Sequence, residues 1–212
     1  MPPAANRPEV ACPHCGAPLP IRSPAAVLVI CEYCQTAVYW DADAIHAAGQ
    51  QAALTEGFTR LYRGATGAIE GEALEVLGRI RYRSDRGFWD EWFVRIGDET
   101  AWLTEDDHEL ALQSPRDPDA LGDVLGLGPG DRFELPEGTF EVDEVGEAET
   151  VGVEGQLPQK ILTGERYRFL DASSLDGRHA LGVELDDDPP TAFLGRWLDH
   201  GAVSLDDEGE DW

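Results

Sequence analysis

Residues 78–103 read GRIRYRSDRGFWDEWFVRIGDETAWL, and this stretch decides the fold. Ile80 and Tyr82 alternate with three arginines, which is the period of a strand with one buried face and one wet face. Turn-forming residues at 84–87 and 97–98 separate two further apolar, aromatic segments. The pattern predicts a meander of three antiparallel strands. Because three tryptophans lie in it, we expect the neighbouring chain to pack on it.

Short apolar segments separated by Gly, Pro and Asp turns continue on both sides of the meander. This spacing predicts a mainly β body, an antiparallel sandwich or barrel. A weak internal repeat aligns Gly64 with Gly130 and residues 74–76 with 140–142. The repeat indicates two related β-lobes joined by a Pro- and Asp-rich linker. We place the first lobe, the linker and the second lobe at 63–112, 113–123 and 124–205.

The remaining segments flank this body. Residues 1–10 are rich in Pro and Ala and are expected to be disordered, and the acidic tail at 206–212 is expected to be mobile. Residues 41–62 are rich in Ala and have Asp near their start. That composition predicts a short helix linking an N-terminal module to the body.

The four cysteines form two C-x-x-C pairs, Cys12 with Cys15 and Cys31 with Cys34. Two such pairs at this separation are typical of a four-thiolate zinc site, and residues 11–40 are therefore predicted to form a zinc ribbon. Four thiolates leave no open coordination position, so the zinc would be structural. Because the module is small, the metal would supply much of its folding free energy. A rubredoxin-like iron centre and a dithiol redox pair are the alternatives.

The charge balance is strongly acidic, with 42 acidic against 16 basic residues and a formal net charge of −26. Such a surface repels phosphate backbones and anionic headgroups, which excludes nucleic acid and lipid as expected direct partners. Cationic partners fit better, although an acid excess can also serve solubility alone. The chain has no apolar run long enough to span a bilayer and no readable secretory signal, so we expect a cytoplasmic protein.

Trp89, Asp90, Glu91 and Trp92 form the densest cluster of aromatic and acidic residues. Neighbouring residues of a strand point to opposite faces, so Asp90 and Glu91 cannot be a facing acid–base pair on one sheet surface. Glu91 is instead predicted to neutralise an arginine of residues 79–83 across the strand pair. The sequence has no hydrolase, nucleotide-binding or zinc-protease motif, and we assign no catalytic residue.

Several motifs resemble those of a bacterial protein family. They are CPHCG, CEYC, GRIRYR, FWDEW, AWLTE, VEGQLP and FLGRWLD. Their combination is similar to that of the uncharacterised DUF4178 domain family. The resemblance implies a non-enzymatic cytoplasmic protein. Members tend to be encoded near small membrane proteins of unknown function and polyamine aminopropyltransferases, which by analogy implies a link to envelope or polyamine homeostasis.

Three functional hypotheses follow. The first is a non-catalytic adaptor that presents Trp89 and Trp92, with Asp90 and Glu91 as an acidic rim, to a protein partner, which could be a small membrane protein. The second is a sensor in which the same aromatic rings and carboxylates surround a polyamine or another small cation. An enzyme of an unrecognised type is the third. A flat apolar patch would favour the adaptor, whereas a deep aromatic pocket with inward carboxylates would favour the sensor.

Overall fold

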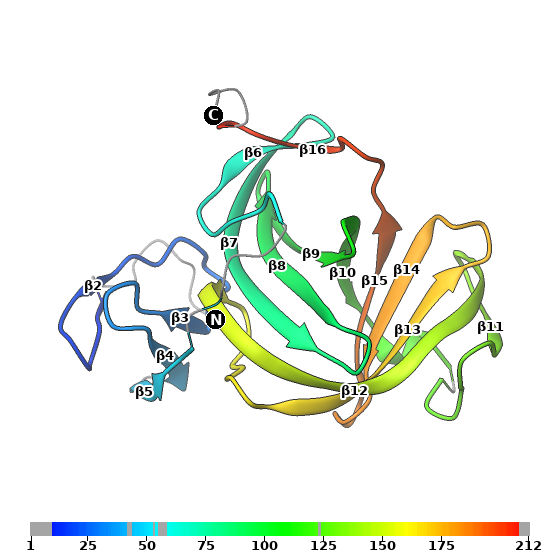
Figure 1. Cartoon of the computed structure of the whole chain (residues 1–212), viewed down its shortest axis with the longest axis horizontal. Helices are drawn as coiled ribbons and strands as arrows, with labels where there is room; N and C mark the ends of the chain where they lie inside the picture. The colour runs from blue at the N-terminus through cyan, green and yellow to red at the C-terminus, as the bar shows by residue number, and fades with distance from the viewer. Residues whose placement is uncertain (1–9, 42–43, 53, 55–58, 123, 208–212) are drawn as a thin grey trace.

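The computed structural model describes residues 10–41, 44–52, 54, 59–122 and 124–207 (Figure 1). Its regular structure is almost entirely β, which confirms the predicted fold class. The strands are β1 (Val10–Ala11), β2 (Pro18–Leu19), β3 (Leu28–Ile30), β4 (Thr36–Asp41), β5 (Ala44–Gln50), β6 (Thr66–Ile69), β7 (Glu72–Arg83), β8 (Phe88–Ile96), β9 (Glu99–Asp106), β10 (Glu109–Arg116), β11 (Arg132–Leu135), β12 (Gly138–Leu157), β13 (Arg166–Ser174), β14 (His179–Glu184), β15 (Thr191–Trp197) and β16 (Val203–Leu205). A single 3-10 helix, η2 (Pro118–Ala120), accompanies them in the described part.

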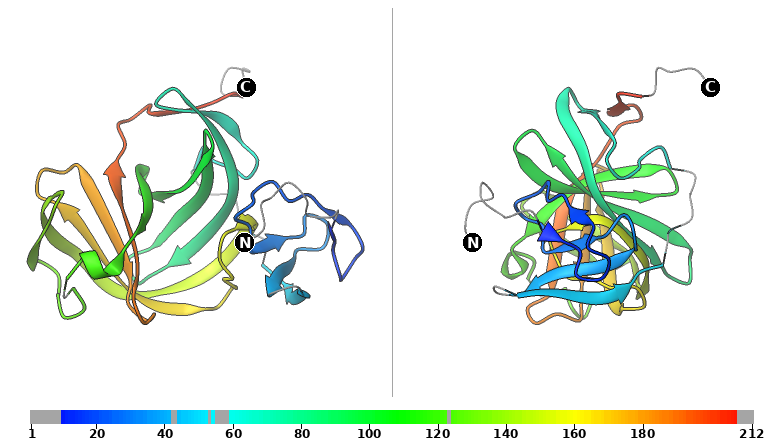
Figure 2. Two further views of the ribbon diagram at one scale, coloured as in Figure 1. Left: turned by 180° about the vertical axis from the view of Figure 1, so that it is seen from behind. Right: turned by 90° about the vertical axis from the view of Figure 1, so that its left-hand side faces the viewer.

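Eight strands within the described residues close into a ring of antiparallel pairs. The order β7-β8-β9-β10-β15-β14-β13-β12 returns to its start because β12 also pairs with β7. Figures 1 and 2 show the ring as a barrel, with the long strand β12 curving along one side. A closed sheet of eight strands has an interior just wide enough to be filled by side chains or to hold one small ligand.

Strand alternation assigns side chains to the inside and the outside of the ring. In β8, Trp89 and Phe93 pack with the inner apolar cluster, whereas Trp92 and Val94 belong to an outer cluster. The outer cluster is completed by β6 and β16, which contribute Ile69, Val203 and Leu205. A comparable outer cluster lies on the other half of the ring, and its members include Leu121, Val124, Leu135, Phe140, Leu170 and Leu181. Each half of the ring therefore has an apolar cluster packed on its outer face.

The two halves of the ring repeat the same backbone geometry. The N–H of Gly64 donates to the carbonyl of Val76 at 2.8 Å, and the N–H of Gly130 donates to the carbonyl of Val142 at 2.8 Å. An irregularity in strand pairing follows directly after Val76 in β7 and directly after Val142 in β12. The weak sequence repeat thus corresponds to a repeat of local structure.

The description as two lobes is nevertheless not confirmed, because the halves meet along two seams of one sheet. These seams are the β7–β12 and β10–β15 pairs. The linker expected at 113–123 needs correction, since residues 113–116 belong to β10 and pair with β15. The physical reason is that β10 is needed to close the ring, and Gln113 is buried in it.

The helix expected over 41–62 is also wrong where the structure describes the chain. β5 (Ala44–Gln50) pairs there with β4 as the edge strand of the N-terminal module. Gly49 has φ +87°, which a right-handed helix does not allow, so the Ala-rich composition is overridden by strand pairing. Residues 42–43, 53 and 55–58 lie outside the described residues, as do 1–9 and 208–212, which make up most of the two ends. Where the ends are described, the expectation of disorder is wrong, because Val10 is buried in β1 and the N–H of Asp206 donates to the carbonyl of Thr66 at 2.9 Å.

The N-terminal module lies beside the ring and is joined to it through β12 (Figures 1 and 2). β3 pairs with the last residues of β12, so one sheet runs through both parts. The side-chain carbonyl of Gln156 accepts hydrogen bonds from the N–H groups of Arg22 and Ser23, at 2.8 and 3.1 Å, and its amide donates to the carbonyl of Pro20 at 2.7 Å. Gln156 of the VEGQLP motif thus links the N-terminal module to β12 through three hydrogen bonds. Within the described residues, no helix is long and apolar enough to cross a membrane.

Candidate functional site

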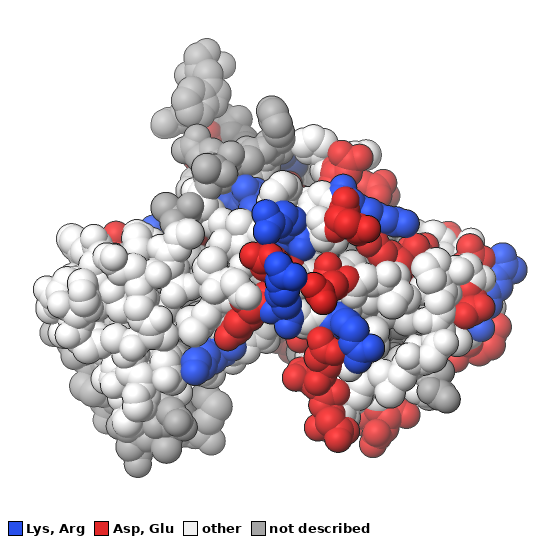
Figure 3. All heavy atoms as spheres, turned by 60° about the horizontal axis from the view of Figure 1, so that its bottom comes forward, with Lys and Arg blue, Asp and Glu red and all other residues white. Residues whose placement is uncertain are grey.

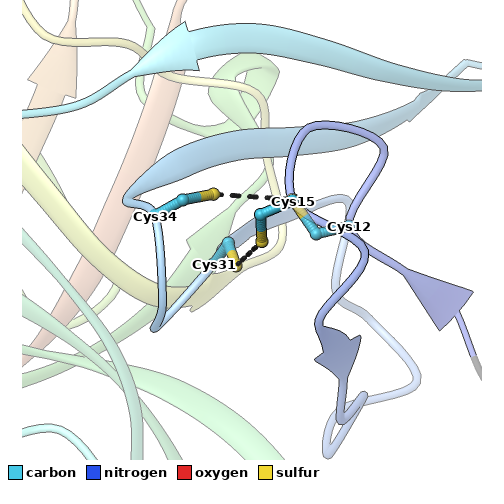
Figure 4. A group of neighbouring side chains, drawn as sticks. All are labelled: Cys12, Cys15, Cys31 and Cys34. Carbon is cyan, nitrogen blue, oxygen red and sulfur yellow. Dashed lines mark hydrogen bonds between the residues drawn. The ribbon is translucent and has the colours of Figure 1, made fainter.

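The four cysteines predicted as metal ligands meet at one point of the N-terminal module. Their sulfur atoms all lie within 4.8 Å of one another, and Figure 4 shows the side chains converging from two loops. The Sγ atoms of Cys12 and Cys34 are 3.7 Å apart, as are those of Cys15 and Cys31. All four are free thiols rather than disulfides. A group of this kind could hold a metal ion.

The two cysteine loops have the same backbone form. The residue after the second cysteine of each pair has a positive φ, +77° at Gly16 and +57° at Gln35. The N–H of Gly16 donates to the carbonyl of Cys12, and that of Gln35 to the carbonyl of Cys31, both at 2.8 Å. Gln35 therefore takes a conformation for which glycine is favoured, and the second loop keeps the backbone form of the first although its residue there is not a glycine.

The second candidate site is the ring interior, which contains a cavity of about 620 Å³. This volume lies in the range of pockets that hold small molecules. Its walls come from the turn at 84–87 and from β8, β9, β10, β12, β13, β14 and β15. The cavity is therefore formed by the ring itself, and it does not lie between the ring and the N-terminal module.

Aromatic rings form much of the cavity wall. Trp89 lies 5.4 Å from Phe169 between ring centroids, and Trp102 lies 6.3 Å from Phe193. Tyr82 stacks behind Trp89 at 5.2 Å and is fully buried. The hydroxyl of Tyr82 has no hydrogen-bond partner among the described residues.

Acidic residues dominate the polar part of the wall. Those that line the cavity are Glu91, Asp106, Asp107, Asp143, Glu144, Asp171 and Glu184. Arg86 is the single basic residue among the described wall residues, and it pairs with Glu144 at 3.1 Å. None of Glu91, Asp171 and Glu184 takes part in an ion pair in the described part of the chain. The three carboxylates thus face the cavity without a positive partner.

Enclosure by the ring raises the pKa of each of these three carboxyl groups. Burial, followed by repulsion from Glu184, raises the pKa of Glu91 to about 8. Burial and the charge of Glu144 raise the pKa of Asp171 to about 7. Burial and the charge of Asp187 raise the pKa of Glu184 to about 7. Asp171 remains exposed to the open cavity, so water there moderates the rise.

Arginines outside the cavity form ion pairs with other carboxylates. Figure 3 shows basic and acidic side chains interleaved in a band at the centre of one face. Among the ion pairs of the protein, Glu149 accepts from both Arg83 and Arg166, at 3.1 and 2.9 Å. Carboxylates on the outside of the ring thus have arginine partners, whereas Glu91, Asp171 and Glu184 inside it do not.

The four residues predicted for a partner surface divide between the two faces of β8. Trp89 and Glu91 line the cavity, whereas Asp90 and Trp92 face the outer side and are buried. The indole N–H of Trp92 donates to Glu105 at 2.9 Å. The structure does not bring the four residues together, and their role toward a partner stays a prediction.

One predicted contact of this cluster is wrong. The carboxylate that neutralises the arginines across the strand pair is Asp90 rather than Glu91. Arg79 and Arg81 each donate two hydrogen bonds to Asp90, all at 2.8 or 2.9 Å. The reason is the register, because Arg81 lies directly opposite Asp90 and the two side chains therefore share a face, while Glu91 lies opposite Ile80.

Sequence reasoning missed the half of the cavity wall that β13 and β14 supply. Tyr167, Phe169 and Asp171 alternate along β13, and Glu184 ends β14. The alternation is visible in the sequence, and it predicts a strand. It does not predict that this face looks into a cavity, because that follows only from closure of the ring.

Comparison with known proteins identifies a family for the chain but no activity. No curated protein matches the chain, and no solved structure does. A family model described as "Domain of unknown function (DUF4178)" matches residues 63–200, which contain all eight strands of the ring. The protein therefore belongs to the DUF4178 family.

Proposed function

We propose that the protein is a non-catalytic binding protein whose ring interior holds a small organic cation and whose N-terminal module is stabilised by a structural zinc ion. One observation carries the first half of this proposal. Glu91, Asp171 and Glu184 point into an aromatic-walled cavity in which they have no basic partner. The protein thus presents to one small volume three carboxyl groups whose ionised forms a bound cation would stabilise.

The chemistry of the wall selects the ligand class. An enclosed carboxylate is costly in its ionised form unless a positive charge or hydrogen-bond donors accompany it. An ammonium or guanidinium group would supply that charge, and the faces of Trp89 and Phe169 attract cations. An anion would be repelled, and a neutral apolar ligand would leave the carboxylates unpaired. An organic cation is the class that satisfies both the rings and the acids.

This placement favours the cation-binding hypothesis over the adaptor hypothesis. Trp89 and Glu91 lie inside a pocket, and Trp92 is fully buried rather than part of a flat open patch. Polyamines fall within the ligand class, as do monovalent ammonium compounds. A protein partner, including a small membrane protein, remains a separate proposal to which we assign no residue.

Zinc is the metal that the cysteine group supports best. Four thiolates contributed by two tight loops match the tetrahedral coordination of a closed structural zinc site. The hydroxyl of Thr36 lies 3.2 Å from Cys34 Sγ, within hydrogen-bond distance of this ligand. A metal ion binds the ionised form of each thiol, so zinc binding should be accompanied by deprotonation of the four cysteines.

The experiment is isothermal titration calorimetry with choline, putrescine and 3,3-dimethyl-1-butanol, the neutral carbon analogue of choline. We expect saturable binding of at least one cation at one site per chain and no binding of the neutral analogue, since only the cation pairs with the carboxylates. Trp89→Ala should weaken binding, whereas Tyr62→Ala, an aromatic change at an exposed position outside the cavity wall, should leave it unchanged. If neither cation binds, or if the neutral analogue binds as well as choline, the proposal is wrong.

A further inference from the structure

We propose that the cationic group of the ligand binds at Asp171, in a space that the ring keeps open by having Gly182 directly opposite on β14. This inference rests on the proposed function and identifies the anchoring carboxylate and the residue that limits ligand size. It follows from comparing the two halves of the ring position by position.

The irregularities in strand pairing after Val76 of β7 and after Val142 of β12 serve as reference points for comparing positions in the two halves. After the irregularity in β7, Gly78 lies opposite Phe93 on β8. After the irregularity in β12, Glu144 lies opposite Asp171 on β13. Phe93 and Asp171 therefore hold corresponding positions in the repeated structure.

The next strand of each half continues the correspondence. Phe93 lies opposite Trp102 on β9, and Asp171 lies opposite Gly182 on β14. In the first half this pair consists of two large aromatic rings, with centroids 5.2 Å apart and both side chains buried. In the second half the same two positions hold a carboxylate and no side chain at all. The first half fills its share of the ring interior, and the second half leaves its share open.

Backbone geometry gives no other reason for a glycine at position 182. Gly182 does not have a positive φ, so its conformation is open to other residues. A Cβ atom there would lie 3.4 Å from Asp171 Oδ1 and 3.9 Å from Gln113 Nε2, which are ordinary contacts. At Gly195, by contrast, a Cβ atom would lie 1.8 Å from the carbonyl oxygen of Leu112. Gly195 is required by strand packing, whereas Gly182 provides room beside a carboxylate.

The surroundings of this space suit a cation. Phe193 lies opposite Gly182 on β15 and also lines the cavity. The side chain of Gln113 is fixed beside the space, because its carbonyl oxygen accepts a hydrogen bond from Thr104 at 2.7 Å. A carboxylate, an aromatic ring and an oriented amide thus border one open volume. Asp143 and Glu144 also lie along the wall and add negative charge near Asp171.

Calorimetry with choline and putrescine tests this placement in the full-length protein. We expect Asp171→Asn to weaken binding of the better ligand by about thirtyfold or more, since it removes the charge that the cation pairs with. Gly182→Leu should abolish binding because the side chain fills the space, and Gly182→Ala should weaken it by less. Glu184→Gln should weaken binding by less than about threefold. Asp199→Asn, the same kind of change at an exposed position, should leave the affinity unchanged. Thermal unfolding of each variant shows whether it is folded, and Gly182→Ala gives the size test if Gly182→Leu is not.

The outcomes separate this inference from the proposed function. If a cation binds the wild type, and Asp171→Asn and Gly182→Ala bind it unchanged while Glu91→Gln or Glu184→Gln lose it, the anchor is elsewhere and the inference is wrong. If the wild type binds no cation, the proposed function fails and the inference fails with it.

Discussion

The guanidinium group of Arg79 donates two hydrogen bonds to the carboxylate of Asp90, at 2.9 and 2.8 Å, and both residues are buried. Arg81 binds the same carboxylate from the adjoining position on its face of β7, again with two hydrogen bonds. The guanidinium of Arg79 also lies over the ring of Trp92, at 4.6 Å from its centroid. One carboxylate thus binds two arginines at the outer side of the ring.

Removing that carboxylate should destabilise the protein severely. Asp90→Ala leaves the buried guanidinium of Arg79 without a counter-ion, and we expect a loss of about 3–5 kcal/mol in the free energy of unfolding. Urea denaturation measures the change. The matched control is Glu147→Ala, which breaks an ion pair with Arg166 in which both side chains are 61% exposed, and which should change stability little. Equal effects of the two variants would contradict the structural role of Asp90.

The metal centre gives a second prediction. Purified protein should contain one zinc ion per chain, and substitution by cobalt should give the absorption of a tetrahedral four-sulfur site, because four thiolates converge on one point. Cys12→Ser should lower the metal content, whereas His14→Ala should retain it, since the four cysteines complete the coordination. Stoichiometric iron, or a disulfide among the four cysteines, would show that the zinc assignment is wrong.

Loss of the metal should lower the stability of the ring as well as that of the N-terminal module. β3 pairs with β12, and Leu28 shares an apolar cluster with Leu157 and Ile80 of the ring. Because the module covers these residues, chelation should lower the melting temperature of the ring as well as that of the module. Apart from Trp40 of β4, the tryptophans in the described residues lie in ring strands, so near-ultraviolet circular dichroism of a Trp40→Phe variant reports on the ring. An unchanged melting curve of this variant after metal removal would contradict the coupling.

The convergence of the four cysteines could be predicted from the sequence, because they lie in two local C-x-x-C loops whose spacing is typical of metal sites. The strand that carries Trp89 and Asp90 could also be predicted from its alternation. The ring could not, since its closure depends on pairing between β7 and β12, which lie far apart in the sequence. The cavity wall depends in turn on that closure, so Asp171 could not be singled out from the sequence. The helix predicted for the Ala-rich segment that includes β5 is wrong, because strand pairing with β4 outweighs the local helix propensity there.

The enclosed carboxylates predict how stability depends on pH. Folding raises the pKa of Glu91 to about 8, above the usual value of 4.5, so the folded state binds this proton more tightly than the unfolded state. Stability contributed by the protonated form should therefore decrease as pH rises from about 4.5 to about 8. Glu91→Gln removes the titration, and its stability relative to wild type should increase across this window. Urea denaturation at pH 5 and pH 8 measures the difference, and a constant difference between the two proteins would contradict the raised pKa.

The same groups predict that cation binding releases protons. Asp171 and Glu184 have pKa values raised to about 7, so at pH 7 a share of the cavity carboxyl groups is protonated before the ligand enters. A bound ammonium group favours the ionised forms and lowers these pKa values, so protons leave as the cation binds. Calorimetry at pH 7 in two buffers of different ionisation enthalpy should show net proton release, and affinity should increase between pH 6 and pH 8. In Asp171→Asn the release should be smaller, while Asp199→Asn should leave it unchanged. Cation binding with no proton release and no pH dependence would mean that the ligand sits away from these carboxylates.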